Sequence, residues 1–169
     1  MPKKSMARNF ILLVFSLGTA IIAGYIAAYY TVPSLPWFTA LIKPELTPPV
    51  WIFQPVWTIL YIMMGLSLYR ILANGIRKKD AMLGFAFFVF QLLLNIGWSY
   101  MFFGLHSIFF GFICIIGLWL ILLCTIIQLL RFSVSAAALL LPYLFWVTFV
   151  AFLNYLIMTL NPISYSLAI

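Results

Sequence analysis

The stretch WFTALIKPELTPPVWIFQPVW, residues 37–57, separates two strongly apolar segments and decides how this chain folds. It holds four prolines, the only glutamate and three tryptophans. Proline fixes φ and biases the preceding residue toward extended backbone, so such a segment is stiff without being regular. We therefore expect a structured loop here, with long apolar helices on either side of it.

The composition of the chain places those helices in a membrane. Hydrophobic residues make up 67% of the 169 residues, charged residues 7%, and the mean hydropathy is +1.21, which no water-soluble domain shows. Five charge-free runs approach or exceed the roughly 20 residues that a helix needs to cross a bilayer. None of them alternates like a barrel strand. The sequence predicts an all-α membrane protein, a bundle of five transmembrane helices. The runs are Phe10–Tyr30, Trp51–Tyr69, Ala81–Leu105, Ser107–Leu130 and Phe132 to the C-terminus.

We expect a single transmembrane domain over residues 1–169. Basic residues before the first run resemble a signal peptide, but the run is long and no convincing small-residue cleavage site follows it, so we interpret it as a helix. Short connections elsewhere predict that consecutive helices are antiparallel neighbours. The expected helices span about 9–30, 50–73, 81–104, 107–130 and 134–160, with a lid loop at 31–49.

The basic residues are distributed very unevenly over the two ends of these helices. Threading the five spans puts eight on one side and only Lys43 on the other, which predicts a cytoplasmic N-terminus and an external C-terminus and lid loop. The net charge of +7 is then topological, and we expect no nucleic-acid partner because short loops cannot build a folded basic face. The eight basic residues on the predicted cytoplasmic side are Lys3, Lys4, Arg8, Arg70, Arg77, Lys78, Lys79 and Arg131.

Several kinds of site are not expected. Cys114 and Cys124 lie ten residues apart on one predicted helix, about 15 Å in rise, so they cannot form a disulfide with each other. His106 is the only histidine and the chain has two acidic residues, so we predict no metal site. No nucleophile–base constellation or phosphate-binding loop is found, so we expect neither hydrolytic nor phosphoryl-transfer chemistry.

The lid loop has the length of a functional binding loop. Within it, PWFTALI could form one or two helical turns with Trp37, Leu41 and Phe38 turned toward the membrane. Aromatic residues also anchor loops at membrane interfaces, and both interpretations stay open.

The helices carry small, aromatic and amide residues at helical spacing. Ser16, Ala20, Gly24 and Ala28 form a stripe on the first helix that lets another helix approach, within the protomer or across a dimer. Amides are costly against lipid and should face the interior, more as interhelical hydrogen bonds than as ligand contacts. The aromatic residues lie in the half beneath the loop, which favours a capped aromatic cavity over ordinary core packing. The aromatic and amide residues form one face on each of three predicted helices: on the second, Phe53, Trp57, Tyr61 and Gly65; on the third, Gln91, Asn95, Trp98 and Phe102; and on the fifth, Trp146, Phe149, Val150, Leu153 and Asn154.

These motifs resemble the tryptophan-rich sensory protein and translocator protein (TspO/MBR) family, the bacterial and mitochondrial relatives of the peripheral benzodiazepine receptor. The resemblance runs from about Trp37 to Asn161. It rests on WFTALIKPELTPPVWIFQPVWTILYIMMG, QLLLNIGWSYMFFG and PYLFWVTFVAFLNYLIMTLN. It implies a five-helix bundle, commonly dimeric, in a bacterial cell membrane, with a pocket under the first long loop that binds porphyrins such as protoporphyrin IX or haem, benzodiazepine-type ligands or sterols.

The resemblance also implies which residues line that pocket. Phe38, Thr39 and Leu46 stand where family loops often have tyrosine, aspartate and a second tryptophan, and Val150 stands where many relatives have a small residue. No base follows Tyr155, so the animal-type sterol motif is absent. The implied lining is Ala27, Tyr30, Trp37, Pro44, Trp51, Phe53, Trp57, Tyr61, Asn95, Trp98, Phe110, Ile113, Trp146, Phe149, Val150, Leu153 and Asn154.

Three functions follow from these observations. The first is a sensor or regulator that binds a porphyrin or another flat apolar ligand and needs no cofactor. The second, implied by the resemblance, is an enzyme that degrades protoporphyrin with light and oxygen through Trp57 and Trp146. The third is a porphyrin or sterol transporter, although the sequence shows neither an inverted repeat nor an ionisable residue at the middle of a span.

Overall fold

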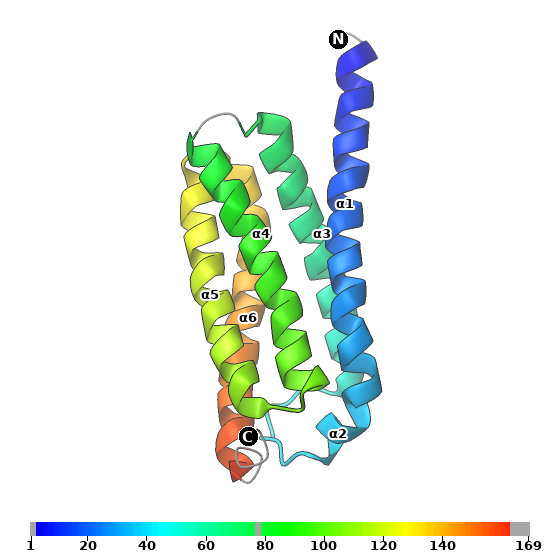
Figure 1. Cartoon of the computed structure of the whole chain (residues 1–169), viewed down its shortest axis with the longest axis vertical. Helices are drawn as coiled ribbons and strands as arrows, with labels where there is room; N and C mark the ends of the chain where they lie inside the picture. The colour runs from blue at the N-terminus through cyan, green and yellow to red at the C-terminus, as the bar shows by residue number, and fades with distance from the viewer. Residues whose placement is uncertain (1–2, 77–78, 163–169) are drawn as a thin grey trace.

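The computed structural model describes residues 3–76 and 79–162, and all of its regular structure is helical (Figure 1). Five helices in this part of the chain are long and apolar enough to cross a membrane, which confirms the predicted fold class. The elements are α1 (Lys3–Thr31), η1 (Val32–Ser34), α2 (Leu35–Ala40), α3 (Val50–Asn74), α4 (Lys79–Ser99), η2 (Tyr100–Gly104), α5 (Ile108–Leu130) and α6 (Val134–Leu160).

One helix begins well before its expected bound, and another changes its helical type before it ends at the expected residue, Gly104. Helix α1 begins at Lys3 instead of near residue 9, and its first turns project beyond the neighbouring helices (Figure 1). The hydropathy pattern marks where a helix enters the membrane, whereas lysine and arginine are good helix formers that continue it into water. Helix α4 ends in the π-helical turn η2, which no periodicity in the sequence indicated.

The helices are arranged around the bundle in the order α1, α3, α6, α5, α4. Helices α4, α5 and α6 are consecutive neighbours, as predicted, but α3 and α4 make only slight contact, so that part of the prediction was wrong. The physical reason is a layer of bulky side chains between them. Tyr61 of α3 reaches Asn95 of α4 through its hydroxyl group, and the ring of Trp57 stacks on that of Trp98 at 6.0 Å.

The small-residue stripe of α1 packs against α3 within the protomer. Ser16 and Ala20 are fully buried. A Cβ atom on Gly65 would lie 3.0 Å from the Cα atom of Leu17, and one on Gly24 would lie 2.7 Å from the ring of Tyr61. Because either contact is too short for a side chain, the two helices can approach this closely only with glycine at these positions.

The polarity of the bundle agrees with the threading for the charges that can be placed. Arg8, Arg70, Lys79 and Arg131 lie within or next to the terminal two turns of their helices on one side of the bundle, and Lys43 follows α2 on the other side. Figure 1 shows these two ends of the bundle. Arg77 and Lys78, and the side chains of Lys3 and Lys4, lie outside the described residues. Which end faces the cytoplasm stays a prediction.

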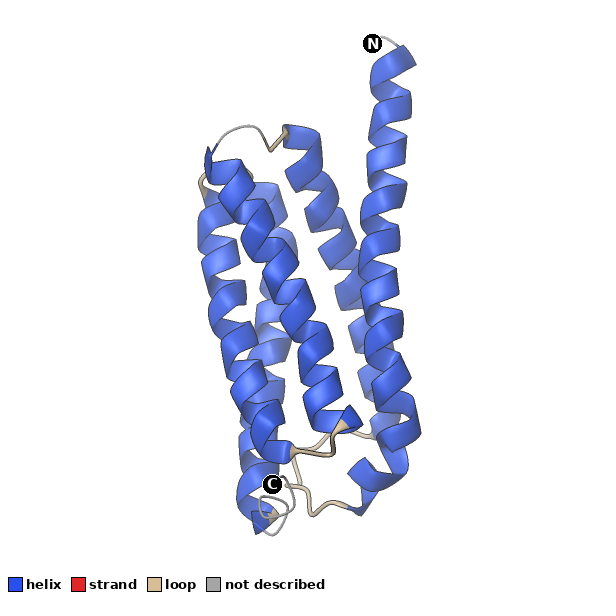
Figure 2. Ribbon diagram, viewed as in Figure 1, coloured by secondary structure: helices blue, strands red, loops and turns tan. Residues whose placement is uncertain are grey.

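The connection between α1 and α3 is the one long link in the described chain (Figure 2). Its first part is helical, with Pro33 in η1 and Pro36 in the first turn of α2, where proline needs no hydrogen-bond partner. The expected helical turns are therefore present in α2. Residues 41–49 then run without a long helix to the start of α3 and complete a cover over this end of the bundle.

Candidate ligand-binding pocket

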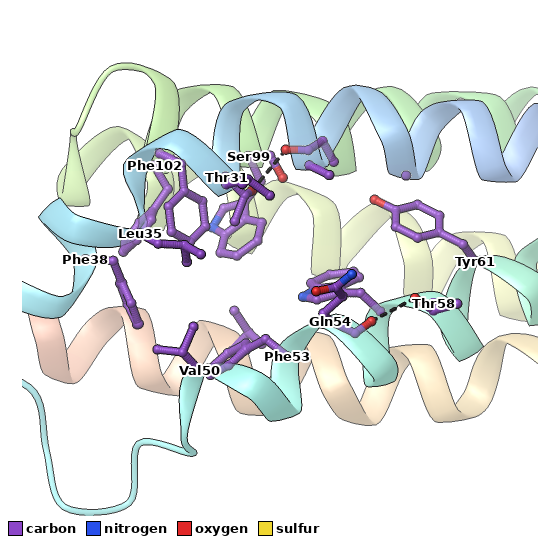
Figure 3. Close-up of a pocket in the computed structure, with 18 of the residues that line it drawn as sticks. Thr31, Leu35, Phe38, Val50, Phe53, Gln54, Thr58, Tyr61, Ser99 and Phe102 are labelled. Carbon is purple, nitrogen blue, oxygen red and sulfur yellow. Dashed lines mark hydrogen bonds between the residues drawn. The ribbon is translucent and has the colours of Figure 1, made fainter.

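A cavity of about 520 Å³ lies under α2, between α1, α3, α6 and the C-terminal end of α4. Phe38, Phe53 and Phe102 converge at the lid end of the cavity, whereas Tyr61 lies at the opposite end (Figure 3). The phenyl ring of Phe38 is buried, so α2 closes the cavity with an apolar side chain instead of merely crossing above it.

Stacked aromatic rings form one wall of the cavity. The rings of Trp57 and Trp98 lie 6.0 Å apart at 29°, and those of Trp98 and Phe102 lie 5.8 Å apart at 27°. Trp146 stands behind this wall, with its ring 6.5 Å from that of Trp57 and 5.7 Å from that of Phe53. The wall therefore presents aromatic faces from α3 and from the end of α4, a surface that suits a flat apolar ligand.

Two buried amides hold the helices around the cavity. Asn95 accepts a hydrogen bond from the hydroxyl of Tyr61 and donates one to that of Tyr143 at 2.8 Å. Asn154 accepts one from Nε1 of Trp98 at 3.4 Å and donates one to the backbone carbonyl of Ile108 at 3.1 Å. Both side chains are nearly fully buried, which confirms that they face the interior. Their bonds join different helices, as the preferred interpretation of these amides predicted.

The cavity lining contains no charged side chain. Lys43 is the basic residue on the lid, and its Nζ atom donates to the carbonyl oxygens of Phe38, Thr39 and Leu41 at 2.9, 2.7 and 2.8 Å. Desolvation lowers the pKa of this ammonium group. Lys43 therefore neutralises the carbonyl end of α2 and stabilises the lid, which leaves it little capacity to bind an anion.

The lid is attached to the bundle at two places. The Ser34 hydroxyl donates to the carbonyl of Phe103 at 2.8 Å and lies 3.2 Å from Nε2 of His106, whose ring stacks on Trp37 at 4.6 Å. At the other end, the amide of Asn161 accepts from the backbone N–H of Ile42 at 3.0 Å and donates to its carbonyl at 2.8 Å. These contacts connect the lid to the α4–α5 turn and to the end of α6.

Most of the residues implied by the resemblance lie at or directly behind the cavity. Asn95 supports Tyr61 from behind, Trp146 packs against Trp57, and Phe149 packs against Trp146 with the two rings 5.5 Å apart. Those that line the cavity are Ala27, Trp51, Phe53, Trp57, Tyr61, Trp98, Val150, Leu153 and Asn154.

The remaining implied residues do not line the cavity. Phe110 and Ile113 are 42% and 53% exposed on α5, which lies behind α4 and α6 and cannot reach it. Tyr30 packs against Tyr29 and Tyr100 at the end of α1. Trp37 packs between the lid and the turn that follows α4, against His106 and Phe102, and Pro44 belongs to the irregular part of the loop.

The sequence reasoning missed a second, more polar side of the cavity. Gln54 and Thr58 line it one turn apart on α3, beside the aromatic face, and Figure 3 shows both pointing toward it. Gly24 and Tyr25 of α1 lie opposite, and Tyr25 is 77% exposed. The i, i+4 spacing of Gln54, Thr58 and Ile62 could have identified this face. Because these residues and Tyr25 are exposed, the cavity wall between α1 and α3 is formed in part by residues on the outside of the bundle.

The fold and the cavity together define a class of protein: a five-helix membrane protein with an aromatic cavity beneath a lid. Comparison with known proteins identifies the family. The TspO/MBR family model matches residues 10–160, and the chain belongs to this family.

Named relatives agree with that assignment. The chain is 40% identical over 158 residues to the tryptophan-rich protein TspO of Chlorobaculum tepidum, covering 93% of this chain and 100% of the relative. It is 38% identical to the tryptophan-rich protein TspO of Archaeoglobus fulgidus, covering 90% and 99%. It is also 36% identical to the translocator protein of Ovis aries, covering 70% and 71%. The similarity therefore extends to both microbial and animal members.

Proposed function

We propose that this protein binds flat, largely apolar small molecules of the porphyrin type in the pocket beneath α2 and acts as a sensor or regulator. The observation that supports this most strongly is the cavity of about 520 Å³ with stacked indole rings along one wall. Apolar pockets with a few fixed polar groups are typical small-molecule sites. One relative, 31% identical, carries the name tryptophan-rich sensory protein, which is consistent with a sensory role.

The ligand's ring system lies against the wall formed by Trp57 and Trp98, and its uncharged polar substituents lie toward Gln54 and Thr58. Burying a carboxylate without a partner is costly, and the cavity lining carries no cation. The acidic groups of a porphyrin therefore remain at the rim, near the exposed side chain of Trp51, and contribute little to affinity. Sterol-like molecules satisfy the same requirements.

Titration of the purified protein with protoporphyrin IX, followed by tryptophan quenching, tests this function. Val150→Trp fills cavity space without removing a hydrogen bond, so we expect affinity to fall at least tenfold. Phe152→Trp is the matched control, because it adds the same residue to an exposed position of the same helix. Equal affinity in both variants and wild type would place the binding site elsewhere. The dimethyl ester of protoporphyrin IX should bind at least as well as the acid.

A second function, oxidative degradation of a bound porphyrin, is favoured by one specific arrangement. Trp57 lines the cavity, and its ring is 6.5 Å from that of Trp146 and 6.0 Å from that of Trp98. An indole in contact with an excited porphyrin can donate an electron, with oxygen as the acceptor and light as the energy source. Illumination of the complex in air separates this function from binding alone, since a binding protein leaves the porphyrin spectrum intact.

A further inference from the structure

Among the described residues, four have a buried polar side-chain atom without a hydrogen-bond partner: Ser16, Gln91, Ser133 and Trp146. Two of them, Gln91 and Ser16, are completely buried. Gln91 of α4 is 0% exposed, and neither Nε2 nor Oε1 of its amide is bonded. Ser16 of α1 is also 0% exposed, and its hydroxyl is likewise without a partner. Neither residue lines the cavity described above. The neighbouring amide Asn95, one turn from Gln91, has both its oxygen and its nitrogen bonded.

Gln91 and Ser16 lie at the same depth in the bundle. Tyr61 of α3 is bonded to Asn95 of α4. Gly65 lies four residues from Tyr61 on α3, and Gln91 lies four residues from Asn95 on α4. Both steps are about 6 Å long and run away from the lid. Gly65 lies against Ser16, because a Cβ atom built on it would be 3.3 Å from the Ser16 carbonyl oxygen. Since α1 packs against both α3 and α4, the two orphan side chains belong to one interior layer directly below the floor of the pocket.

A direct bond between the two residues would not satisfy them. A carboxamide offers two N–H donors and an oxygen with two lone pairs, whereas a serine hydroxyl offers one hydrogen and its own lone pairs. A single bond between them would leave the other N–H donors and lone pairs unpaired. This is costly inside a membrane bundle, because no lipid group can replace the missing partner. In protein interiors, groups of this kind are satisfied by ordered water, which typically makes about three hydrogen bonds.

We propose that the layer between α1 and α4 holds a bound water site, with Gln91 as its main ligand and Ser16 as its second. The site lies beneath the Tyr61–Asn95–Tyr143 network, which separates it from the ligand cavity. The interior of the bundle is thus divided into an aromatic compartment under the lid and a small hydrated compartment deeper in the membrane. This division does not depend on what the cavity binds.

Water next to the Gln91 amide can be detected directly by NMR in detergent micelles. The chain has three glutamines, Gln54, Gln91 and Gln128, so selective ¹⁵N labelling gives three side-chain amide pairs. Gln54→Met and Gln128→Met assign the Gln91 signals by elimination without altering the proposed site. We expect rotating-frame cross-relaxation between water and the Gln91 amide protons. Gln128 is the reference, because it is buried and its Nε2 atom donates to the backbone carbonyl and Oδ1 of Asp80.

Two results would overturn the proposal. One is a water signal at Gln91 no stronger than that at Gln128, which would mean that the layer is dry. The other concerns Ser16→Ala, a change that removes the hydroxyl but leaves Gln91 in place. If the signal arises from bound water it persists in this variant at reduced strength. Its complete loss would mean that Gln91 bonds directly to the serine and that the signal reached it through hydroxyl exchange.

Discussion

Removing the Asn95 amide should destabilise the bundle by a predictable amount. Asn95→Leu leaves the hydroxyls of Tyr61 and Tyr143 buried without their present partner. Hydrogen bonds between transmembrane helices contribute about 0.6 kcal/mol on average and up to about 1.7 kcal/mol. Since Asn95 makes two of them, we expect the network to contribute about 1–3 kcal/mol to the free energy of unfolding.

The measurement is unfolding by SDS titration in mixed micelles, carried out as a double-mutant cycle. Asn95→Leu also changes the shape of the side chain, which carries a packing cost of its own. The same change in a Tyr61→Phe, Tyr143→Phe background keeps that packing cost but has no hydroxyls left to orphan. The difference between the two backgrounds is therefore the network term. If Asn95→Leu costs the same in both backgrounds, the reasoning about this network is refuted.

Three further predictions concern orientation, the lid and chemistry. Cysteines placed in the 31–50 loop should react with an impermeant thiol reagent in whole cells, and cysteines in the α3–α4 connection should not; the reverse pattern would invert the orientation. Asn161→Ala removes both bonds to Ile42, so the amide of that residue should exchange hydrogen at least tenfold faster, and an unchanged rate would mean that the lid is held elsewhere. Trp57→Phe and Trp146→Phe raise the cost of removing an electron while keeping a ring. If the protein degrades porphyrin, both variants should bind it, but on illumination in air it should bleach no faster than porphyrin in detergent without protein. Equal bleaching in the wild type and both variants would exclude the tryptophan mechanism.

The transmembrane helices could be predicted because a charge-free run of about 20 residues has few alternatives in a chain this apolar. Their order around the bundle could not. Periodicity shows which residues share a helix face, but not which helix that face meets. The resemblance therefore placed Phe110 and Ile113 in the pocket, although α5 lies behind two other helices. Trp146 shows the same limit on a finer scale, since it shares a face with Val150 but packs behind Trp57.

The slight contact between α3 and α4 connects the fold to the pocket. Had these helices packed closely, as their short connection predicted, no space for a ligand could have formed between them. They are kept apart by Tyr61, Trp57 and Trp98, which are too large for a close helix–helix contact and which meet across the gap. The close contacts of the bundle are made instead by α1, whose small residues fit against α3. The small residues of α1 thus allow close helix packing on one side of the bundle. The large aromatic residues of α3 and α4 keep those two helices apart and so leave space for the cavity.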